Sequence, residues 1–225
     1  MTGTDKIAID LWTDVVCPWC YVGEGRLQEA LEAEGLTDRF ELRTHSFELD
    51  SSAPADAGAA TNVEHLEKKL GKSAEEVRQM ESQIAALAEE LGRDYATERP
   101  MANTRRIHRV MQALGDRGRD FFFELQRDYF TGTVNPFEDS AIVAEAVKHG
   151  MDRSDVEQVL ADEDSFDHEV ETDIMRAHAM GAQGVPFTVF DNRFSAPGAL
   201  PVDVYRKVLR QLVDEQDGAD KGQES

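Results

Sequence analysis

The sequence has only two cysteines in 225 residues, and both lie in one Cys-x-x-C motif, Cys17-Pro18-Trp19-Cys20. Two cysteines this close together cannot join distant parts of a chain, which excludes the disulfide framework of small secreted domains. A chain of this length can instead bury a hydrophobic core of ordinary size, as one domain or as one domain with an insertion. The cysteines are therefore candidates for chemistry rather than for scaffolding.

Long apolar runs are also missing. No segment carries the roughly 20 consecutive apolar residues that cross a bilayer. The first residues, Met1 to Lys6, lack the basic region and apolar core of a secretory signal. We therefore expect a cytoplasmic protein with no membrane partner.

Positive charge is scarce, because 24 Lys and Arg face 45 Asp and Glu, which gives a net charge of −21. Such a surface repels nucleic acid and anionic membranes, so we expect neither as a partner. The basic residues comprise 7 Lys and 17 Arg. Excess carboxylate with little lysine favours adaptation to concentrated salt, which screens self-repulsion; an ordinary acidic cytosolic protein is the alternative.

Apolar periodicity divides the chain into two kinds of structure. Alternating residues predict strands near both ends, whereas almost every segment from 63 to 181 has the spacing of an amphipathic helix. A helical pattern also follows Cys20 and stops at Gly35. The predicted strands are Lys6–Trp12, Phe40–Phe47, Phe187–Phe190 and Arg193–Ser195, and a last helix is predicted over Val202–Val213.

This order predicts an α/β domain that is interrupted by an all-helical insertion between its second and third strands. Residues 1–62 and 182–214 would form the two parts of the α/β domain, and residues 63–181 the insertion. Residues 215–225 are predicted to be a disordered acidic tail.

The Cys-x-x-C motif lies where a strand leads into a helix, which is the arrangement that disulfide exchange uses. We expect Cys17, at the helix N-terminus, to be the nucleophile, because free N–H groups and the helix dipole lower a thiol pKa there. Cys20, one turn further on, can then resolve a mixed disulfide. Pro18 suits the first helical turn, and Trp19 is expected to cover the pair and to contact substrate.

Metal binding is the main alternative for the two cysteines. A closed zinc site needs about four ligands, and the sequence has no second cysteine pair and no paired histidine cluster. Two of the six histidines or a second subunit could complete such a site, but we favour redox chemistry and predict no metal. A binding module, in which the acidic insertion docks a partner, is the hypothesis from a different class.

Four segments together resemble one family. The stretch from Asp14 to Gly23 looks like the active-site signature of the FrnE-like branch of the DsbA-family oxidoreductases. Three further segments match in order: Asn103-Thr104 with Ile107-His108-Arg109, Gly181 to Phe187, and Phe194 to Pro201. The resemblance covers roughly Ile7 to Leu212, which is far more specific than a lone Cys-x-x-C.

The resemblance implies a thioredoxin-like fold, and a cis Val185–Pro186 peptide that faces Cys17. The backbone of Val185 would then pair with an extended substrate segment. No cofactor is expected beyond the Cys17–Cys20 disulfide. The expected partners are protein or small-molecule thiols and disulfides, with a cytosolic thiol reductant as electron donor.

Two further residues and one related activity complete the expectations. His108 is a candidate for the cleft near Cys17, where a cation favours the thiolate, with a structural helix contact as the alternative. Asp14 is expected to be a turn residue, with proton transfer to Cys20 as the alternative. Kappa-class glutathione transferases and chromene-carboxylate isomerases share the implied fold and insertion, but they generally lack the second cysteine, so Cys20 argues against such an activity. A cytoplasmic address favours reduction, whereas the DsbA resemblance favours oxidation.

Overall fold

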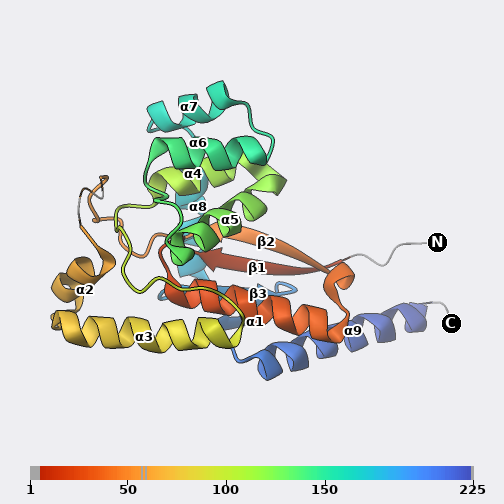
Figure 1. The fold of residues 1–225 in the computed structure, drawn as a ribbon. Coiled ribbons are helices and arrows are strands. Elements are labelled where there is room, and N and C mark those ends of the chain that lie inside the picture. Colours follow the sequence, from red (N-terminus) through yellow and green to blue (C-terminus); the bar gives the residue numbers. More distant parts are fainter. Residues whose placement is uncertain (1–5, 57, 59, 224–225) are drawn as a thin grey trace.

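A computed structural model describes residues 6–56, 58 and 60–223 of the chain. Its strands and helices follow the predicted order, with a block of helices between the second and third strands (Figure 1). The elements are β1 (Ile7–Thr13), α1 (Pro18–Glu34), η1 (Thr37–Arg39), β2 (Phe40–Ser46), α2 (Asn62–Leu70), α3 (Ala74–Glu90), α4 (Arg105–Leu114), η2 (Gly115–Arg117), α5 (Gly118–Thr131), α6 (Asp139–Lys148), α7 (Arg153–Ala161), α8 (Asp167–Ala179), β3 (Phe187–Phe190), β4 (Phe194–Pro197) and α9 (Val202–Gln223).

The four described strands form one sheet in the order β2-β1-β3-β4. Strands β1 and β2 are parallel and are joined by the crossover helix α1, as parallel neighbours require. Strand β3 runs antiparallel to both β1 and β4. Asp191 and Asn192, which join β3 to β4, both have φ of 52°, the left-handed conformation that a tight hairpin turn needs. The mixed α/β fold predicted from the sequence is confirmed.

Helices α1 and α9 cover one face of the sheet (Figure 1). The core on this face joins Ile9 and Leu11 of β1 to Leu27 of α1 and to Tyr205 and Leu209 of α9. Alternation along β1 directs its odd-numbered residues to this face. The even-numbered Trp12 packs instead with Ala177 of α8 and with residues of β3. Helix α8 therefore covers the second face of the sheet. The helical block expected as one insertion thus has two roles, because α8 packs on the sheet while other helices of the block form a core of their own.

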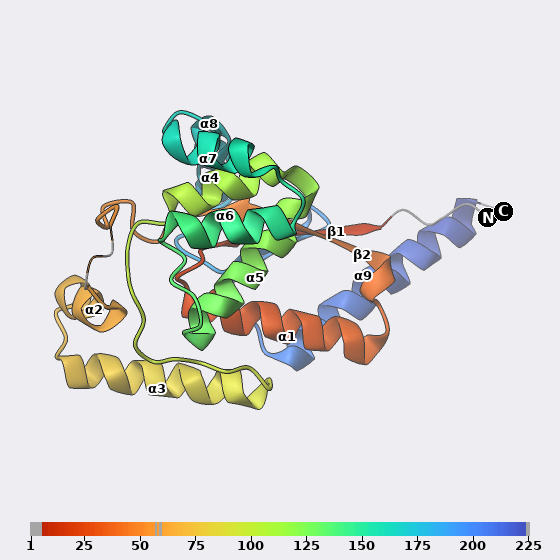
Figure 2. The same cartoon turned by 45° about the horizontal axis from the view of Figure 1, so that its top comes forward.

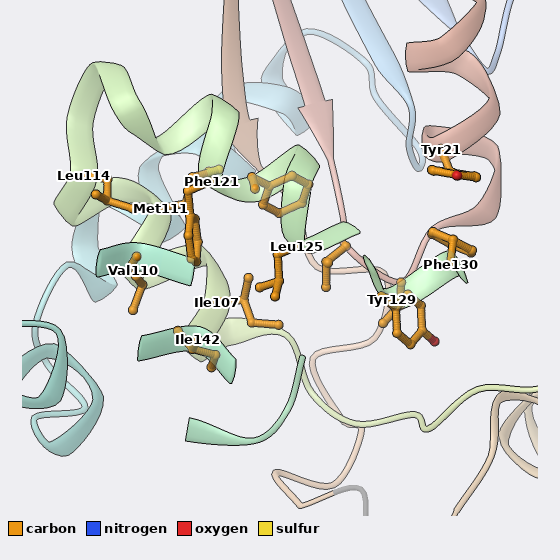
Figure 3. Close-up of a cluster of buried hydrophobic side chains, with 14 of the residues drawn as sticks. Tyr21, Ile107, Val110, Met111, Leu114, Phe121, Leu125, Tyr129, Phe130 and Ile142 are labelled. Carbon is orange, nitrogen blue, oxygen red and sulfur yellow. The ribbon is translucent and has the colours of Figure 1, made fainter. Parts of the chain in front are cut away.

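Helices α3 to α7 form a second core that continues onto α1. Figure 3 shows the labelled side chains of this core, which come from α4, α5, α6 and α1. Tyr21 of α1 stacks on Phe130 of α5 with ring centroids 4.7 Å apart. Helix α3 lies along α1 in both cartoon views (Figure 2) and adds Ile84 and Ala88 to the same core. The start of α1, where the cysteines lie, is thus held by the helical block.

The acidic tail departs from its prediction, because α9 continues without a break to Gln223. Contacts with the α/β domain explain the difference: Arg39 binds Asp217 at 2.6 Å, and Arg193 binds Glu215 at 2.8 Å. Strong helix formers such as Glu and Gln add to this stability. Residues 224 and 225 of the predicted tail lie outside the described residues. Across residues 6–56, 58 and 60–223, no helix is both long and apolar enough to span a bilayer.

Candidate active site

Cys17 and Cys20 lie where β1 leads into α1, as predicted. Cys17 is the N-cap residue of α1, and its Sγ accepts a hydrogen bond of 3.3 Å from the backbone N–H of Cys20. Pro18 occupies the first turn, where its missing N–H leaves no hydrogen bond unmade. Both cysteines are free thiols with only 2% of their surface exposed. Trp19, between them in the sequence, is 44% exposed; that it covers the pair and contacts substrate stays a prediction.

The segment before β3 approaches Cys17 from the far end of the chain. The Val185–Pro186 peptide is cis, as the resemblance implies. The Cys17 thiol donates a hydrogen bond of 3.5 Å to the carbonyl oxygen of Val185. Pairing within the sheet begins only at Phe187, and no described backbone hydrogen bond involves Val185. The backbone of Val185 therefore lies beside the reactive sulfur and outside the sheet.

A close approach between Gly23 and the segment that carries Pro186 holds this arrangement together. A Cβ atom at Gly23 would lie 3.3 Å from Cγ of Pro186 and 3.2 Å from Cβ of Ala199. These distances are tighter than ordinary van der Waals contacts. Glycine thus allows α1 to pack directly against the segment that places Val185.

Asp14 forms part of the turn before α1, and its carboxylate is buried beside that turn. Its carbonyl accepts the N–H of Cys17 at 3.0 Å, which is the turn expected from the sequence. Its side chain is fully buried, and Oδ2 accepts the N–H of Leu49 at 2.7 Å. Gln126 of α5 donates to the Asp14 carbonyl at 3.0 Å. Asp14 is therefore both a turn residue and a buried acid.

His108 does not line an open cleft. Its side chain is 0% exposed, and Nε2 lies 3.5 Å from Oδ1 of Asp14. The ring of Phe122 lies 5.4 Å from the imidazole, centroid to centroid. The expected cleft position is wrong because α4 packs this face against α5 and the Asp14 turn, which closes it to solvent.

The surroundings of Cys17 oppose the thiolate. Burial raises the pKa of the Cys17 thiol well above its ordinary value, and neighbouring Cys20 and the charge of Asp14 act in the same direction. The Cys20 N–H acts the other way but is outweighed. The lowered pKa expected from the helix terminus is thus not found, since that expectation omitted desolvation.

A polar network on the second face of the sheet escaped the sequence analysis. His45 of β2 stacks on Trp12 with ring centroids 4.3 Å apart and contacts Asp10 and Asp173 through its two ring nitrogens. Asp10 is 1% exposed. Asp173 comes from α8, 128 residues after His45, so no local pattern indicates it.

Neither cysteine joins a cluster of potential metal ligands among the described residues. The one group of three acidic or histidine side chains found there with ligand atoms close together is Glu124, Glu145 and His149. Glu145 in this group already accepts a hydrogen bond from Lys148 at 2.6 Å.

Comparison with known proteins agrees with this geometry. The family model described as a DSBA-like thioredoxin domain matches residues 8–210. A probable DsbA oxidoreductase of Streptomyces coelicolor is 32% identical, with a TM-score of 0.84 over 93% of this chain and 91% of that one. No curated protein matches the sequence.

Two more distant solved structures share the fold. A 2-hydroxychromene-2-carboxylate isomerase is 17% identical, with a TM-score of 0.69 over 95% of this chain and 98% of that one. The cytosolic disulfide reductase DsbM of Pseudomonas aeruginosa, solved with GSH, is 16% identical, with a TM-score of 0.58 over 93% of this chain and 98% of that one. On the family match and the Streptomyces relative, the chain belongs to the DsbA-like thioredoxin-domain family.

Proposed function

We propose that the protein is a thiol–disulfide oxidoreductase in which Cys17 attacks and Cys20 resolves. The observation that carries this proposal is the position of the Cys17 sulfur. It lies at the start of α1, 3.3 Å from the N–H of Cys20 and 3.5 Å from the carbonyl of Val185. An extended substrate that pairs with the Val185 backbone would bring its own sulfur to Cys17. Trp19 is exposed beside the pair and offers an apolar contact for that substrate.

The surroundings of Cys17 support the reductive direction. In a strong oxidant the reduced form of the cysteine pair is stabilised, so the disulfide form readily takes electrons from a substrate dithiol. Here the Cys17 thiol is buried, donates a hydrogen bond to the Val185 carbonyl and interacts with the charge of Asp14, so the thiolate is not favoured. A pair with these properties gives up electrons more readily than one with a stabilised thiolate.

The reaction proceeds in two exchanges. The Cys17 thiolate attacks one sulfur of a substrate disulfide, which forms the Cys17–substrate bond, breaks the substrate bond and releases a thiolate that takes up a proton. The Cys20 thiolate then attacks Cys17, which forms the Cys17–Cys20 bond and releases the second substrate thiol. Two electrons pass from the cysteine pair to the substrate. A thiol reductant of the glutathione class restores the pair, and no other cofactor is needed.

The proposed substrates are protein or small-molecule disulfides in the cytoplasm. The fold neighbour from Pseudomonas aeruginosa is a cytosolic disulfide reductase that was solved with GSH, which makes glutathione the first small thiol to try. The isomerase among the fold neighbours makes glutathione-dependent isomerisation the competing activity. Placement in the FrnE-like branch stays a prediction.

A redox titration tests the proposal. The wild-type protein is equilibrated in glutathione and dithiothreitol buffers, and the fraction of free Cys17 and Cys20 is counted by the mass added on alkylation. We expect one two-electron transition with a potential nearer to about −270 mV than to about −120 mV. The absence of any two-electron transition would reject the proposed function, and a potential near the upper value would reject its reductive direction.

Single-cysteine variants provide the controls. Cys20→Ser keeps the attacking sulfur and should accumulate a mixed disulfide with a substrate disulfide, whereas Cys17→Ser should accumulate none. Metal analysis of protein purified without chelator addresses the binding alternative. Stoichiometric zinc that depends on both cysteines would favour that alternative over redox exchange.

A further inference from the structure

The buried region behind Cys17 contains polar atoms that make no hydrogen bond within the described part of the chain. They belong to residues that meet where the β1–α1 turn contacts α4 and α5. The atoms are Oδ1 of Asp14, both ring nitrogens of His108, and Oε1 of Gln126. A buried polar group that is left unpaired is destabilising, so a native protein rarely keeps several together without a use for them.

Asp14 and His108 form a buried pair of an acid and a base. Nε2 of His108 faces Oδ1 of Asp14 at 3.5 Å, and both side chains are at most 1% exposed. The other carboxylate oxygen of Asp14 is fixed by the N–H of Leu49, so Oδ1 is the oxygen left for the imidazole. A carboxylate and an imidazole enclosed in this way share a proton far more favourably than either carries an isolated charge.

The pair lies close to the reactive sulfur through the turn itself. The Asp14 carbonyl accepts the N–H of Cys17 at 3.0 Å, and the side-chain amide of Gln126 on α5 donates to the same carbonyl. Gln126 is one helical turn from Phe122, against which His108 packs, so α5 positions both members. The negative charge of Asp14 contributes to the raised pKa of Cys17.

We propose that Asp14 and His108 hold one proton between them and that this proton sets the reactivity of Cys17. With the proton present the pair is neutral, and the Cys17 thiolate forms more readily than it does beside a charged pair. When the proton is lost, the pair carries a negative charge behind Cys17, and the thiol keeps its own proton. Asp14 and His108 are positioning residues in this role, because they act on the sulfur without contacting substrate. The inference rests on the proposed function of Cys17.

Other charged or titratable groups face the pair from each element around it. Cys17 on α1 and Tyr129 on α5 interact with the charge of Asp14. The same elements also carry Cys20 on α1, Glu48 after β2, and Arg105 and Arg109 on α4. Glu48 is neutralised by Arg105 at 2.9 Å, and Arg109 donates to the Asp162 carbonyl. Tyr129 donates to the Pro100 carbonyl, and burial raises its pKa, so it stays neutral. Apart from the cysteines themselves, the Asp14–His108 pair is therefore the ionisable pair that belongs to the turn before Cys17.

Alkylation of Cys17 tests the proposal through two substitutions with opposite expected effects. In a Cys20→Ser background, the rate of iodoacetamide reaction is measured against pH for Asp14→Asn and for His108→Gln. Asp14→Asn removes the negative charge and should raise the rate near neutral pH about tenfold, which corresponds to a pKa about one unit lower. His108→Gln removes the proton carrier and should lower the rate by a similar factor. The double variant should return close to the rate of the background protein.

The opposite changes in alkylation rate that we expect for Asp14→Asn and His108→Gln distinguish this proposal from a merely structural role of the two residues. Substitutions that merely loosened the turn would change Cys17 exposure in the same direction in both variants. Asp10→Asn serves as the matched control, because Asp10 is also a buried carboxylate bound to a histidine and should leave the alkylation profile within about twofold. Any result other than two opposite shifts overturns the proposal.

A measurement without substitution covers the case in which a variant fails to fold. The His108 ring resonances are compared by NMR between reduced protein and protein alkylated at Cys17. We expect a shift of these resonances near neutral pH, because Cys17 and the pair adjoin the same turn; identical resonances contradict the inference. Alkylation and NMR both report on Cys17 without disulfide exchange, so a failed redox titration would reject the proposed function and leave this result intact.

Discussion

The imidazole Nε2 of His45 lies 2.6 Å from the Oδ1 atom of Asp10, and only 2% of the Asp10 side chain is exposed. On the other side of the ring, Nδ1 lies 3.0 Å from Asp173. Burial lowers the pKa of His45, but the hydrogen bonds and charges of the two carboxylates outweigh burial and raise it above 6.5. The two carboxylates therefore favour the cationic form of this histidine between strands β1 and β2 and helix α8.

The raised pKa of His45 gives the first prediction. Because the folded protein binds this proton more tightly than the unfolded chain, the stabilisation is complete below about pH 6.5 and is lost as pH rises through the folded-state pKa. Urea unfolding across this range should show a falling free energy of unfolding. His45→Gln should cost about 3 kcal/mol at the acid end, because the buried Asp10 and the half-buried Asp173 lose their cation, and should flatten the pH dependence. A wild-type protein that is equally stable across the range would contradict the assignment.

The second prediction contrasts two arginine pairs. Arg99 and Glu81 are 1% and 3% exposed and bind each other at 2.9 Å, with three aromatic rings around the guanidinium. Arg99→Ala leaves Glu81 buried and unpaired, so we expect a loss of about 3–5 kcal/mol in the free energy of unfolding. Arg106→Ala breaks the exposed pair with Asp139 and should cost at most about 1 kcal/mol. Equal losses in the two variants would show that burial does not decide the strength of these pairs.

The third prediction concerns two glycines in helices. Gly23→Ala adds a methyl group against Pro186 and Ala199, which should destabilise the protein by about 1 kcal/mol and alter the rate of Cys17 alkylation. Gly218→Ala in α9 meets no atom within 4 Å and should stabilise the helix by about 0.5–1 kcal/mol. Urea unfolding and iodoacetamide kinetics measure the two effects. Two variants that both gained stability would show that the contact at Gly23 is not tight.

Net charge supplies the fourth prediction. With 45 acidic and 24 basic residues, self-repulsion opposes the compact state in dilute buffer. Salt shortens the screening length from about 10 Å at 0.1 M to about 3 Å at 1 M, so the melting temperature should rise with KCl and should rise equally with NaCl. A melting temperature that does not respond to either salt would remove the case for salt adaptation.

Local sequence was sufficient to predict the start of the site. The alternation before Cys17 and the helical spacing after Cys20 lie within a few residues of the motif, and the N-cap position follows from them. The contact with Val185 spans 168 residues, so it came only from the resemblance to a known family. Periodicity defines an element but not the element that packs against it.

The electrostatics of the site could not be predicted for the same reason. Whether His108 faces solvent or Asp14 depends on how α4 packs, and neither residue carries a local pattern that reveals the other. The predicted pKa of Cys17 considered the helix terminus alone, whereas its burial is produced by the whole fold. Likewise, the tail beyond Glu215 looked too polar to fold, but partners at Arg39 and Arg193 hold it as helix.

The contact between Cys17 and Val185 also has a consequence for protein synthesis. Cys17 emerges from the ribosome long before Val185 is synthesised, because 168 positions separate the two residues. Until the last strands dock, the thiol is exposed to water with the ordinary reactivity of an unfolded chain. When the chain is complete and β3 docks, Cys17 becomes buried and is protected from oxidants in solution. The same step forms the contact with Val185.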